Sequence, residues 1–336
     1  MLIVMRKDAS PEACQRVEEV IEALGFTPVT VPGPSRVAIC VTGNEGPVPS
    51  AELERLPAVA EVIRVSRPYK LVSREVHPEN STVAVGDVVI GGEKPILIAG
   101  PCSVETESRT LEIAHAVKTR GASMFRAGAF KPRTSPYAFQ GLGLEGLPTL
   151  ARVREETGLP VVTEVVDTAH VEIVAEHVDM LQVGARNMQN YALLERLAVT
   201  PKPVLLKRGP AATLEEWLMA AEYLLSGGNS QVVLCERGIR TFADHARNTL
   251  DLNVVPLVRE ISHLPILVDP SHGTGDRKRV LPMSLAALAC GAQGLLVETH
   301  TAPSTAYSDA AQTIDIATLG EIGAALPSID LRGTDQ

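Results

Sequence analysis

From residue 93 onward, short apolar runs alternate with longer segments in which apolar residues recur every three or four positions. The short runs have the length and composition of buried parallel strands, and the longer segments have the pattern of amphipathic helices. The predicted strands are Ile96–Ala99, Met124–Ala127, Val161–Glu164, Met180–Val183, Val204–Leu206, Gln231–Cys235, Ile266–Val268 and Gly294–Val297. Eight such units over ~240 residues predict an α/β fold, a (β/α)₈ TIM barrel, because doubly wound sheets usually contain fewer strands.

The segments between these runs carry helix signals. Thr213 and Glu216 have the spacing of a capping box, which fixes the start of one helix. The predicted helices are Thr106–Arg120, Leu147–Glu156, Ala169–His177, Gln189–Leu197, Thr213–Leu225 and Leu281–Cys290.

Residues 1–68 have a different pattern, in which strand-like runs flank two helical segments. Ser10 and Pro11 supply a cap and a first-turn proline for the first helix, which ends at Gly25. The predicted strands are 2–5, Phe26–Val31, Val37–Thr42 and Val59–Val65, and the second helical piece is Ser50–Leu56. This βαββαβ order predicts a small ferredoxin-like domain. We expect this domain either to bind a regulatory ligand or to have a purely structural role.

The two regions are joined by residues 69–92, which we interpret as a linker and a β-hairpin. The hairpin is predicted over Val83–Ile90, with Gly86 and Asp87 in its turn. The predicted domains are therefore 1–68, the connecting segment 69–92 and a barrel over 93–330.

Charge and cysteine content narrow the classes of partner. The chain has 31 basic and 40 acidic residues, a formal charge of −9, which argues against nucleic acid or an anionic membrane as its partner. No apolar run reaches the ~18 residues of a membrane span. The five cysteines form no CxxC pair, so we expect reduced thiols and a cytoplasmic protein.

Positively charged residues cluster where the predicted strands end. The clearest case is 131–136, Lys-Pro-Arg-Thr-Ser-Pro, whose two prolines indicate a rigid loop. Because the carboxyl ends of barrel strands meet at one face, we expect the cations to converge there. They are Arg126, Lys131, Arg133, Arg186, Lys207 and Arg237. Six buried cations without anions would be costly, so the set predicts multiply charged anionic substrates, although one or two of the six could instead pair with acids.

A second set of strand-end residues has the chemistry of metal ligands. It comprises Cys102, His272, Glu298 and Asp309, which follow the first, seventh and eighth predicted strands. Those strands become neighbours when a barrel closes. Sulfur, nitrogen and two carboxylates suit a borderline divalent ion. Taken singly, Cys102 could be a buried small hydrophobe and Asp309 a helix cap, and His300 is an alternative ligand or a supporting group.

Several motifs, in the same order along the chain, resemble those of a known family. They are AGPCSVE at 99–105, FRAGAFKPRTSP at 125–136, GARNMQN at 184–190, LLKRG at 205–209, DPSHGTG at 269–275 and VETH at 297–300. The chain is similar to the 3-deoxy-D-arabino-heptulosonate 7-phosphate (DAHP) synthases, and more narrowly to their type Iβ branch. The related 3-deoxy-D-manno-octulosonate 8-phosphate synthases share the barrel, but their loop at the position of 131–136 has a KANRSS-like sequence.

The resemblance implies a metal-dependent condensation of phosphoenolpyruvate with erythrose 4-phosphate that releases phosphate, the first step of the shikimate pathway. It implies that Cys102, His272, Glu298 and Asp309 hold one Mn²⁺, Fe²⁺, Co²⁺ or Zn²⁺, and that Arg126, Lys131, Arg186, Lys207 and Arg237 surround phosphoenolpyruvate. Pro132, Arg133 and Thr134 would bind the aldose phosphate, and Lys131 and Glu164 are the candidates for proton transfer. The family further suggests tetramers and an aromatic amino acid as effector.

Two other functions remain open on the residues alone. A metal-dependent aldolase acting on a sugar phosphate would need a single phosphate pocket and a zinc site richer in histidine. A non-catalytic sensor of phosphorylated metabolites would bind without turnover, with the amino-terminal domain as its output.

Overall fold

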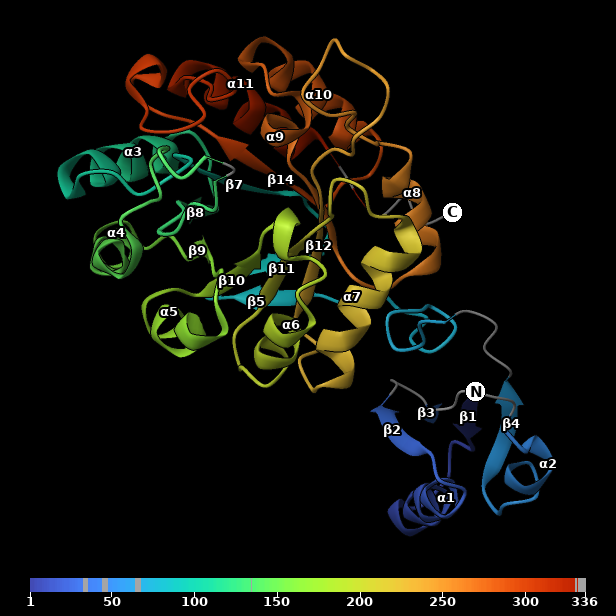
Figure 1. Ribbon diagram of the computed structural model, residues 1–336. Helices are drawn as coiled ribbons and strands as arrows, with labels where there is room; N and C mark the ends of the chain where they lie inside the picture. Colours follow the sequence, from blue (N-terminus) through green and yellow to red (C-terminus); the bar gives the residue numbers. More distant parts are fainter. Residues whose placement is uncertain (33–35, 44–47, 64–67, 134, 330, 332–336) are drawn as a thin grey trace. The chain divides into compact units, whose positions relative to one another are not determined.

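The computed structural model describes residues 1–32, 36–43, 48–63, 68–133, 135–329 and 331. The chain divides into two compact units, Met1–Glu79 with Ile261–His263, and Asn80–Glu260 with Leu264–Gln336 (Figure 1). Within the described ranges, no helix is both long and apolar enough to cross a membrane.

The amino-terminal unit has the predicted βαββαβ order. Its elements are β1 (Leu2–Met5), α1 (Pro11–Ala23), β2 (Thr27–Pro32), β3 (Val37–Thr42), α2 (Ser50–Leu53) and β4 (Val59–Ile63). The strands form one antiparallel sheet in the order β2-β3-β1-β4. Ser10 caps α1 by accepting a hydrogen bond from the backbone N–H of Ala13 at 3.3 Å. The ferredoxin-like prediction is confirmed, and residues 64 and 65 of the last predicted strand lie outside the described residues.

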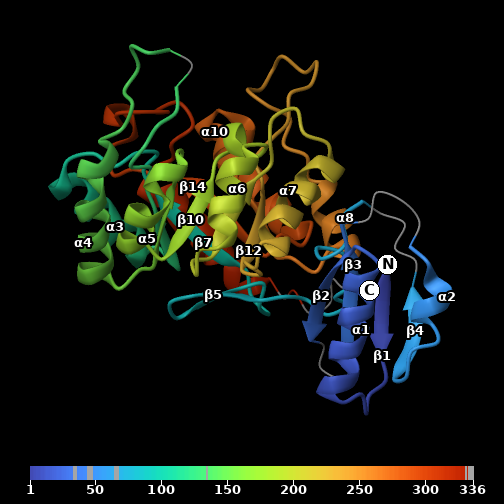
Figure 2. The same ribbon diagram turned by 60° about the horizontal axis from the view of Figure 1, so that its bottom comes forward.

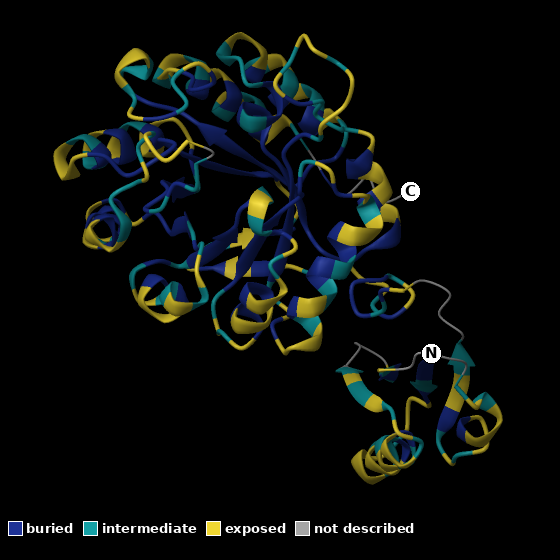
Figure 3. Cartoon of the chain, viewed as in Figure 1, coloured by how far each residue is buried: buried dark blue, intermediate teal, exposed yellow. Residues whose placement is uncertain are grey.

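The second unit is a closed barrel of eight parallel strands. They are β7 (Ile96–Gly100), β8 (Met124–Arg126), β9 (Val161–Glu164), β10 (Met180–Val183), β11 (Val204–Lys207), β12 (Val232–Glu236), β13 (Ile266–Val268) and β14 (Gly294–Glu298). The strands pair in chain order, and β14 pairs with β7 to close the barrel. Apart from Glu164 every strand residue is buried, as the continuous apolar runs predicted (Figure 3). The TIM-barrel prediction is confirmed.

Helices surround these strands (Figure 1). They are α3 (Glu107–Thr119), α4 (Leu147–Thr157), α5 (Val171–His177), α6 (Tyr191–Ala198), α7 (Leu214–Ser226), α8 (Val254–Ile261), α9 (Pro270–Thr274), α10 (Arg277–Ala289) and α11 (Ile316–Ala325). The capping box of Thr213 and Glu216 starts α7 as predicted. Helix α10 begins at Arg277 rather than Leu281, because Asp276 caps it and the helix accommodates Pro282.

The predicted hairpin consists of β5 (Val83–Val85) and β6 (Val88–Ile90). Its buried residues Val83, Val85 and Ile90 belong to one apolar cluster with residues of the barrel strands, which include Ile96 and Met124 at the starts of β7 and β8. The hairpin therefore covers the amino-terminal end of the barrel, and the loops after β8 and β12 extend from the opposite end (Figure 2). The carboxyl-terminal end is left for the functional site.

Candidate active site

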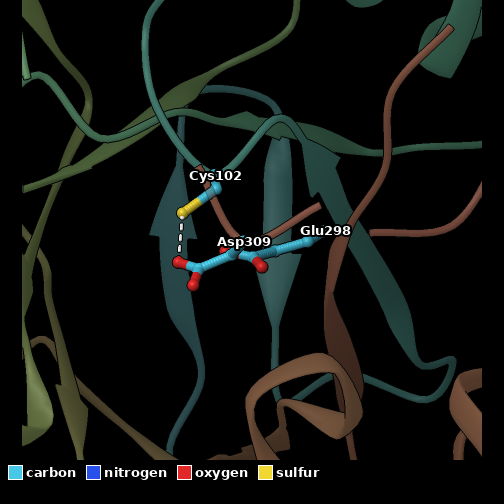
Figure 4. Close-up of side chains that lie close together, drawn as sticks. All are labelled: Cys102, Glu298 and Asp309. Carbon is cyan, nitrogen blue, oxygen red and sulfur yellow. Dashed lines mark hydrogen bonds between the residues drawn. The ribbon is translucent and has the colours of Figure 1, made fainter. Parts of the chain in front are cut away.

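Two neighbouring strands, β7 and β14, position three of the four candidate metal ligands. Cys102 follows β7, Glu298 ends β14, and Asp309 lies in the loop after β14. The thiol of Cys102 donates to Oδ2 of Asp309 at 3.0 Å, and the ligand atoms of these three residues all lie within 4.8 Å of one another (Figure 4). Asp309 has a left-handed φ of 55°, a conformation that aspartate tolerates better than most residues. The three side chains can therefore contact a common ion.

His272 is held beside this trio by helix α9. Asp269 caps the helix, and its Oδ2 lies 2.7 Å from Nδ1 of the imidazole. Because an ionised carboxylate only accepts, Nδ1 carries the proton and Nε2 keeps a lone pair. Nε2 lies 3.4 Å from Oε1 of Glu298. Burial lowers the pKa of His272, so the imidazole is in the neutral form that a metal requires.

The acids and the thiol respond to this environment in opposite ways. Burial alone would raise the pKa of Glu298, but the interactions with the His272 ring and with the Arg126 guanidinium hold it well below its usual range. Burial and the neighbouring Glu298 carboxylate raise the pKa of Cys102 to about 12. The site thus combines an ionised carboxylate with a thiol that would ionise only beside a cation, as a metal site requires.

Three of the six predicted cations pair with acids, more than the one or two we expected. Nη1 of Arg126 lies 2.6 Å from Oε1 of Glu298, and Nζ of Lys207 lies 2.5 Å from Oδ2 of Asp269. Arg133 contacts Asp309 through Nη1 and Oδ2 at 3.5 Å. Glu298 and Asp309 are candidate metal ligands, and Asp269 holds the candidate ligand His272. The three ion pairs therefore connect the predicted cations to the predicted metal ligands.

The remaining cations face a cleft at the mouth of the barrel. Lys131 and Arg237 are buried, and Arg186 is exposed at its rim. Nζ of Lys131 donates to the carbonyl oxygen of Cys102 at 2.8 Å. The residues that line the cleft are Lys131, Pro132, Arg133, Glu164, Ala185, Arg186, Pro210, Arg237, Arg240, Arg247, Asn248, His272 and Asp309. The structure thus brings most of the predicted residues together, and Thr134 lies outside the described residues.

Arg240 and Arg247 line this cleft but were not predicted from the sequence. Both lie in the segment after β12, which also carries Asn248, whose Nδ2 donates to the carbonyl oxygen of His272 at 2.9 Å. The available signal was the presence of two more arginines in a loop that leaves a barrel strand.

Glu164 ends β9 and reaches the cleft half-buried. Its Oε2 accepts a hydrogen bond from Nε2 of Gln182 at 3.4 Å. A Cβ atom at position 184 would lie 2.0 Å from Oε1 of Glu164, so Gly184 makes room for this carboxylate. Within the described part of the chain Glu164 makes no ion pair with Lys131 or Arg186.

His300 does not face the candidate ligands. Its Nδ1 accepts from the backbone N–H of Ala302 at 2.7 Å, and its Nε2 lies 3.4 Å from Oε2 of the buried Glu105. Glu105 also accepts from the backbone N–H of Tyr307 at 2.9 Å. His300 therefore ties the loop after β7 to the loop that carries Asp309.

Comparison with known proteins identifies the family. A family model described as the DAHP synthetase I family matches residues 70–330, and the DAHP synthase ferredoxin-like domain matches residues 1–67. The chain belongs to the DAHP synthetase I family. The predicted resemblance to DAHP synthases with an amino-terminal ferredoxin-like domain is confirmed, and so is the prediction of an aldol-type condensing synthase.

Individual relatives agree with this family. The phospho-2-dehydro-3-deoxyheptonate aldolase of Thermotoga maritima is 45% identical over 322 residues, which are 96% of this chain and 95% of that protein. The crystal structure of this DAHP synthase from Thermotoga maritima has a TM-score of 0.77 at 44% identity and covers 97% of this chain and 96% of its own. A truncated form has a TM-score of 0.73 at 46% identity and covers 77% of this chain and 96% of its own.

Enzymes of the alternative, octulosonate-forming family are more distant relatives of this chain. The 2-dehydro-3-deoxyphosphooctonate aldolase of Syntrophotalea carbinolica is 35% identical over 254 residues, which are 70% of this chain and 91% of that protein. The heptulosonate reading of the loop at 131–136 therefore agrees with the comparisons.

Proposed function

We propose that this chain condenses phosphoenolpyruvate with erythrose 4-phosphate and releases phosphate. One observation carries the proposal beyond the family. Arg126 is buried, with its Nη1 on Glu298, yet its Nε has no hydrogen-bond partner within the described structure. A buried guanidinium nitrogen left unpaired beside metal-type ligands is a position that a substrate anion would satisfy.

The cations would divide between the two substrates. Arg126, Lys131, Arg186, Lys207 and Arg237 would bind the phosphate and carboxylate of phosphoenolpyruvate. Pro132, Arg133 and Thr134 would bind the phosphate of the aldose, with the proline stiffening the loop. The phosphate and carboxylate groups of the substrates would compensate the positive charge that the paired acids leave uncompensated.

Cys102, His272, Glu298 and Asp309 would hold one divalent ion, Mn²⁺, Fe²⁺, Co²⁺ or Zn²⁺. The residues fit such an ion: the thiol of Cys102 and the carboxylates of Glu298 and Asp309 face one another, and Nε2 of His272 lies beside Glu298. When bound, the ion supplies Lewis-acid polarisation of the aldehyde oxygen.

Lys131 and Glu164 would move the protons. In the reaction, C3 of the enol phosphate bonds to the aldehyde carbon, water adds at C2, and phosphate leaves with cleavage of the C–O bond. Lys131, whose Nζ lies on the carbonyl of Cys102, would give a proton to the new hydroxyl group. Glu164, held by Gln182 at the edge of the cleft, would take a proton from the added water.

A substrate panel tests the proposal. Phosphate release would be measured with phosphoenolpyruvate and either erythrose 4-phosphate or arabinose 5-phosphate, with and without Mn²⁺. We expect turnover with the four-carbon sugar, dependent on the metal. Preference for the five-carbon sugar would support the octulosonate reaction, and binding without turnover would support a sensor.

We further propose that residues 1–68 form a regulatory domain, connected by 69–92 to a catalytic barrel over 93–330. An aromatic amino acid would be its effector, and the protein would work in the cytoplasm as a homotetramer. The test compares inhibition by tyrosine, phenylalanine and tryptophan in the full chain and in a chain that begins at residue 69. Equal inhibition of both would contradict a regulatory role for residues 1–68.

A further inference from the structure

The amide of Gln312 connects an arginine at the mouth of the cleft to the carboxylate of Glu298. Gln312 is 2% exposed. Its Nε2 donates to Oε2 of Glu298, and its Oε1 accepts from Nη1 of Arg247 at 2.8 Å. Oε1 of Glu298, the other carboxylate oxygen, faces Arg126 and His272. Both oxygens of the candidate ligand are therefore held by named partners.

The partners fix the orientation of this amide. A guanidinium has only donors, so the oxygen of the Gln312 amide must face Arg247. An ionised carboxylate only accepts, so the NH₂ group must face Glu298. Reversing the amide would place oxygen against oxygen and donor against donor, which would break both hydrogen bonds. Arg247 thus determines the direction in which Gln312 presents its donor to Glu298.

The backbone of Gln312 also supports the second carboxylate. Its N–H donates to the carbonyl oxygen of Asp309 at 3.1 Å, and the hydroxyl of Thr313 donates to the same oxygen at 3.0 Å. These bonds hold the turn in which Asp309 takes its left-handed φ of 55°. One residue therefore supports two candidate ligands, Glu298 at the end of β14 and Asp309 within the loop that follows it.

We propose that Gln312 is a positioning residue for the cation, which orients the carboxylate of Glu298, and that Arg247 acts through Gln312. This inference rests on the proposed metal site. Partners of this kind that orient ligands typically change metal affinity by about 10- to 100-fold when they are removed. Arg247 also lies 3.7 Å from Oδ1 of Asp309, so the experiment must separate the two routes.

The experiment measures the dissociation constant of Mn²⁺ for the full chain by competition with a fluorescent chelator. Gln312→Met keeps the length of the side chain and removes the donor and the acceptor. We expect it to weaken Mn²⁺ binding by about 10- to 100-fold. Arg247→Met should weaken binding less, and the double variant should bind no more weakly than Gln312→Met.

Gln182→Leu is the matched control, because it removes another buried glutamine that donates to a carboxylate, that of Glu164. It should leave the Mn²⁺ affinity unchanged. Melting curves in chelator report folding separately, and Gln312→Leu replaces Gln312→Met if the latter does not fold. A purely structural glutamine would lower the melting temperature without changing the affinity of the folded protein.

The outcomes separate the two proposals. Wild-type chain that binds no Mn²⁺ would overturn both the metal site and the role of Gln312. Wild-type binding with an unchanged affinity in Gln312→Met would overturn the role of Gln312 alone. If the two substitutions raise the Mn²⁺ dissociation constant by factors that multiply in the double variant, Arg247 acts directly on Asp309. That result would overturn its proposed route through Gln312.

Discussion

Nζ of Lys207 lies 2.5 Å from Oδ2 of Asp269, and both side chains are buried. The same oxygen faces Nδ1 of His272, so one carboxylate joins a predicted substrate cation to a predicted metal ligand. Burial by itself would raise the pKa of Asp269, but His272 and Lys207 hold it well below its usual range. Asp269 is therefore ionised at all physiological pH values.

Asp269→Asn tests this junction. The change leaves Lys207 buried without its counter-charge, so we expect the free energy of unfolding to fall by about 3–5 kcal/mol. The asparagine can also donate to Nδ1 and shift the proton of His272 to Nε2, which would weaken Mn²⁺ binding by about 10- to 100-fold. Urea denaturation and Mn²⁺ titration measure the two effects. Unchanged metal affinity would show that Asp269 does not orient the imidazole.

Cys102→Ser tests the thiol ligand. Because a serine hydroxyl ionises far less readily beside a cation than a thiol, the variant lacks one anionic ligand, and we expect it to lose Mn²⁺ and turnover to fall by roughly 100-fold or more. Cys235→Ser is a matched control, since Cys235 is a buried thiol on β12 outside the trio. Metal content and phosphate release would be measured after dialysis against chelator and readdition of Mn²⁺. Full activity of the stripped wild-type chain would contradict the metal role.

Arg133→Ala tests the division of the cations. Arg133 lines the cleft and contacts Asp309 at 3.5 Å, whereas Arg126 is buried and is not among the residues that line the cleft. Loss of one charged hydrogen-bond donor costs about 1.5–3 kcal/mol, so we expect the KM for the aldose to rise by about 10- to 100-fold. The KM for phosphoenolpyruvate should change little. Arg186→Ala should have the opposite preference, and equal effects on both substrates would contradict the division.

Much of the fold could be predicted from the sequence because the signals are local. Each barrel strand is a continuous apolar run, and Cys102, Glu298 and Asp309 come together because β7 and β14 pair at the closure of the barrel. Parallel strands must place their carboxyl ends on one face, so the strand-end residues converge. For Cys102 and Glu298 the prediction depended on strand order alone, whereas the position of Asp309 also depends on the conformation of the loop after β14.

The features of the site that the sequence did not predict depend on long-range contacts between loops and strands. Arg247 and Gln312 lie in different loops, and their hydrogen bond follows from loop conformations that no periodicity encodes. Lys207 and Asp269 lie on β11 and after β13, which are separated by β12, so their pairing required the radius and tilt of the barrel. Such pairs explain why the sequence identified cations and ligands but missed the residues that join them.

Gly184→Ala tests the role of Glu164 without changing the carboxylate itself. The added Cβ would lie 2.0 Å from Oε1 of Glu164, so the carboxylate must move. If Glu164 transfers a proton, kcat should fall by about 100-fold or more, as for Glu164→Gln, with little change in either KM. Steady-state kinetics measure this. A normal kcat in Glu164→Gln would remove Glu164 from the proton transfers.

His263 gives the amino-terminal unit a pH-dependent stability. Burial lowers the pKa of His263 to about 4, and the ring contacts the carbonyl oxygen of Leu71 through Nε2 at 2.8 Å. The unfolded chain, with an ordinary histidine pKa of about 6.5, binds more protons between these values. Stability from the neutral ring is therefore present above pH 6.5 and is lost as the pH falls towards 4, by roughly 3 kcal/mol.

His263→Gln removes this titration and keeps a donor for the carbonyl of Leu71. We expect the loss of stability between pH 7 and pH 4.5 to be smaller in the variant than in the wild-type chain, because the other titrating groups are common to both. Urea denaturation at both pH values, followed by circular dichroism, gives the difference. Identical pH dependence in the two proteins would mean that His263 takes up its proton without unfolding the segment that buries it.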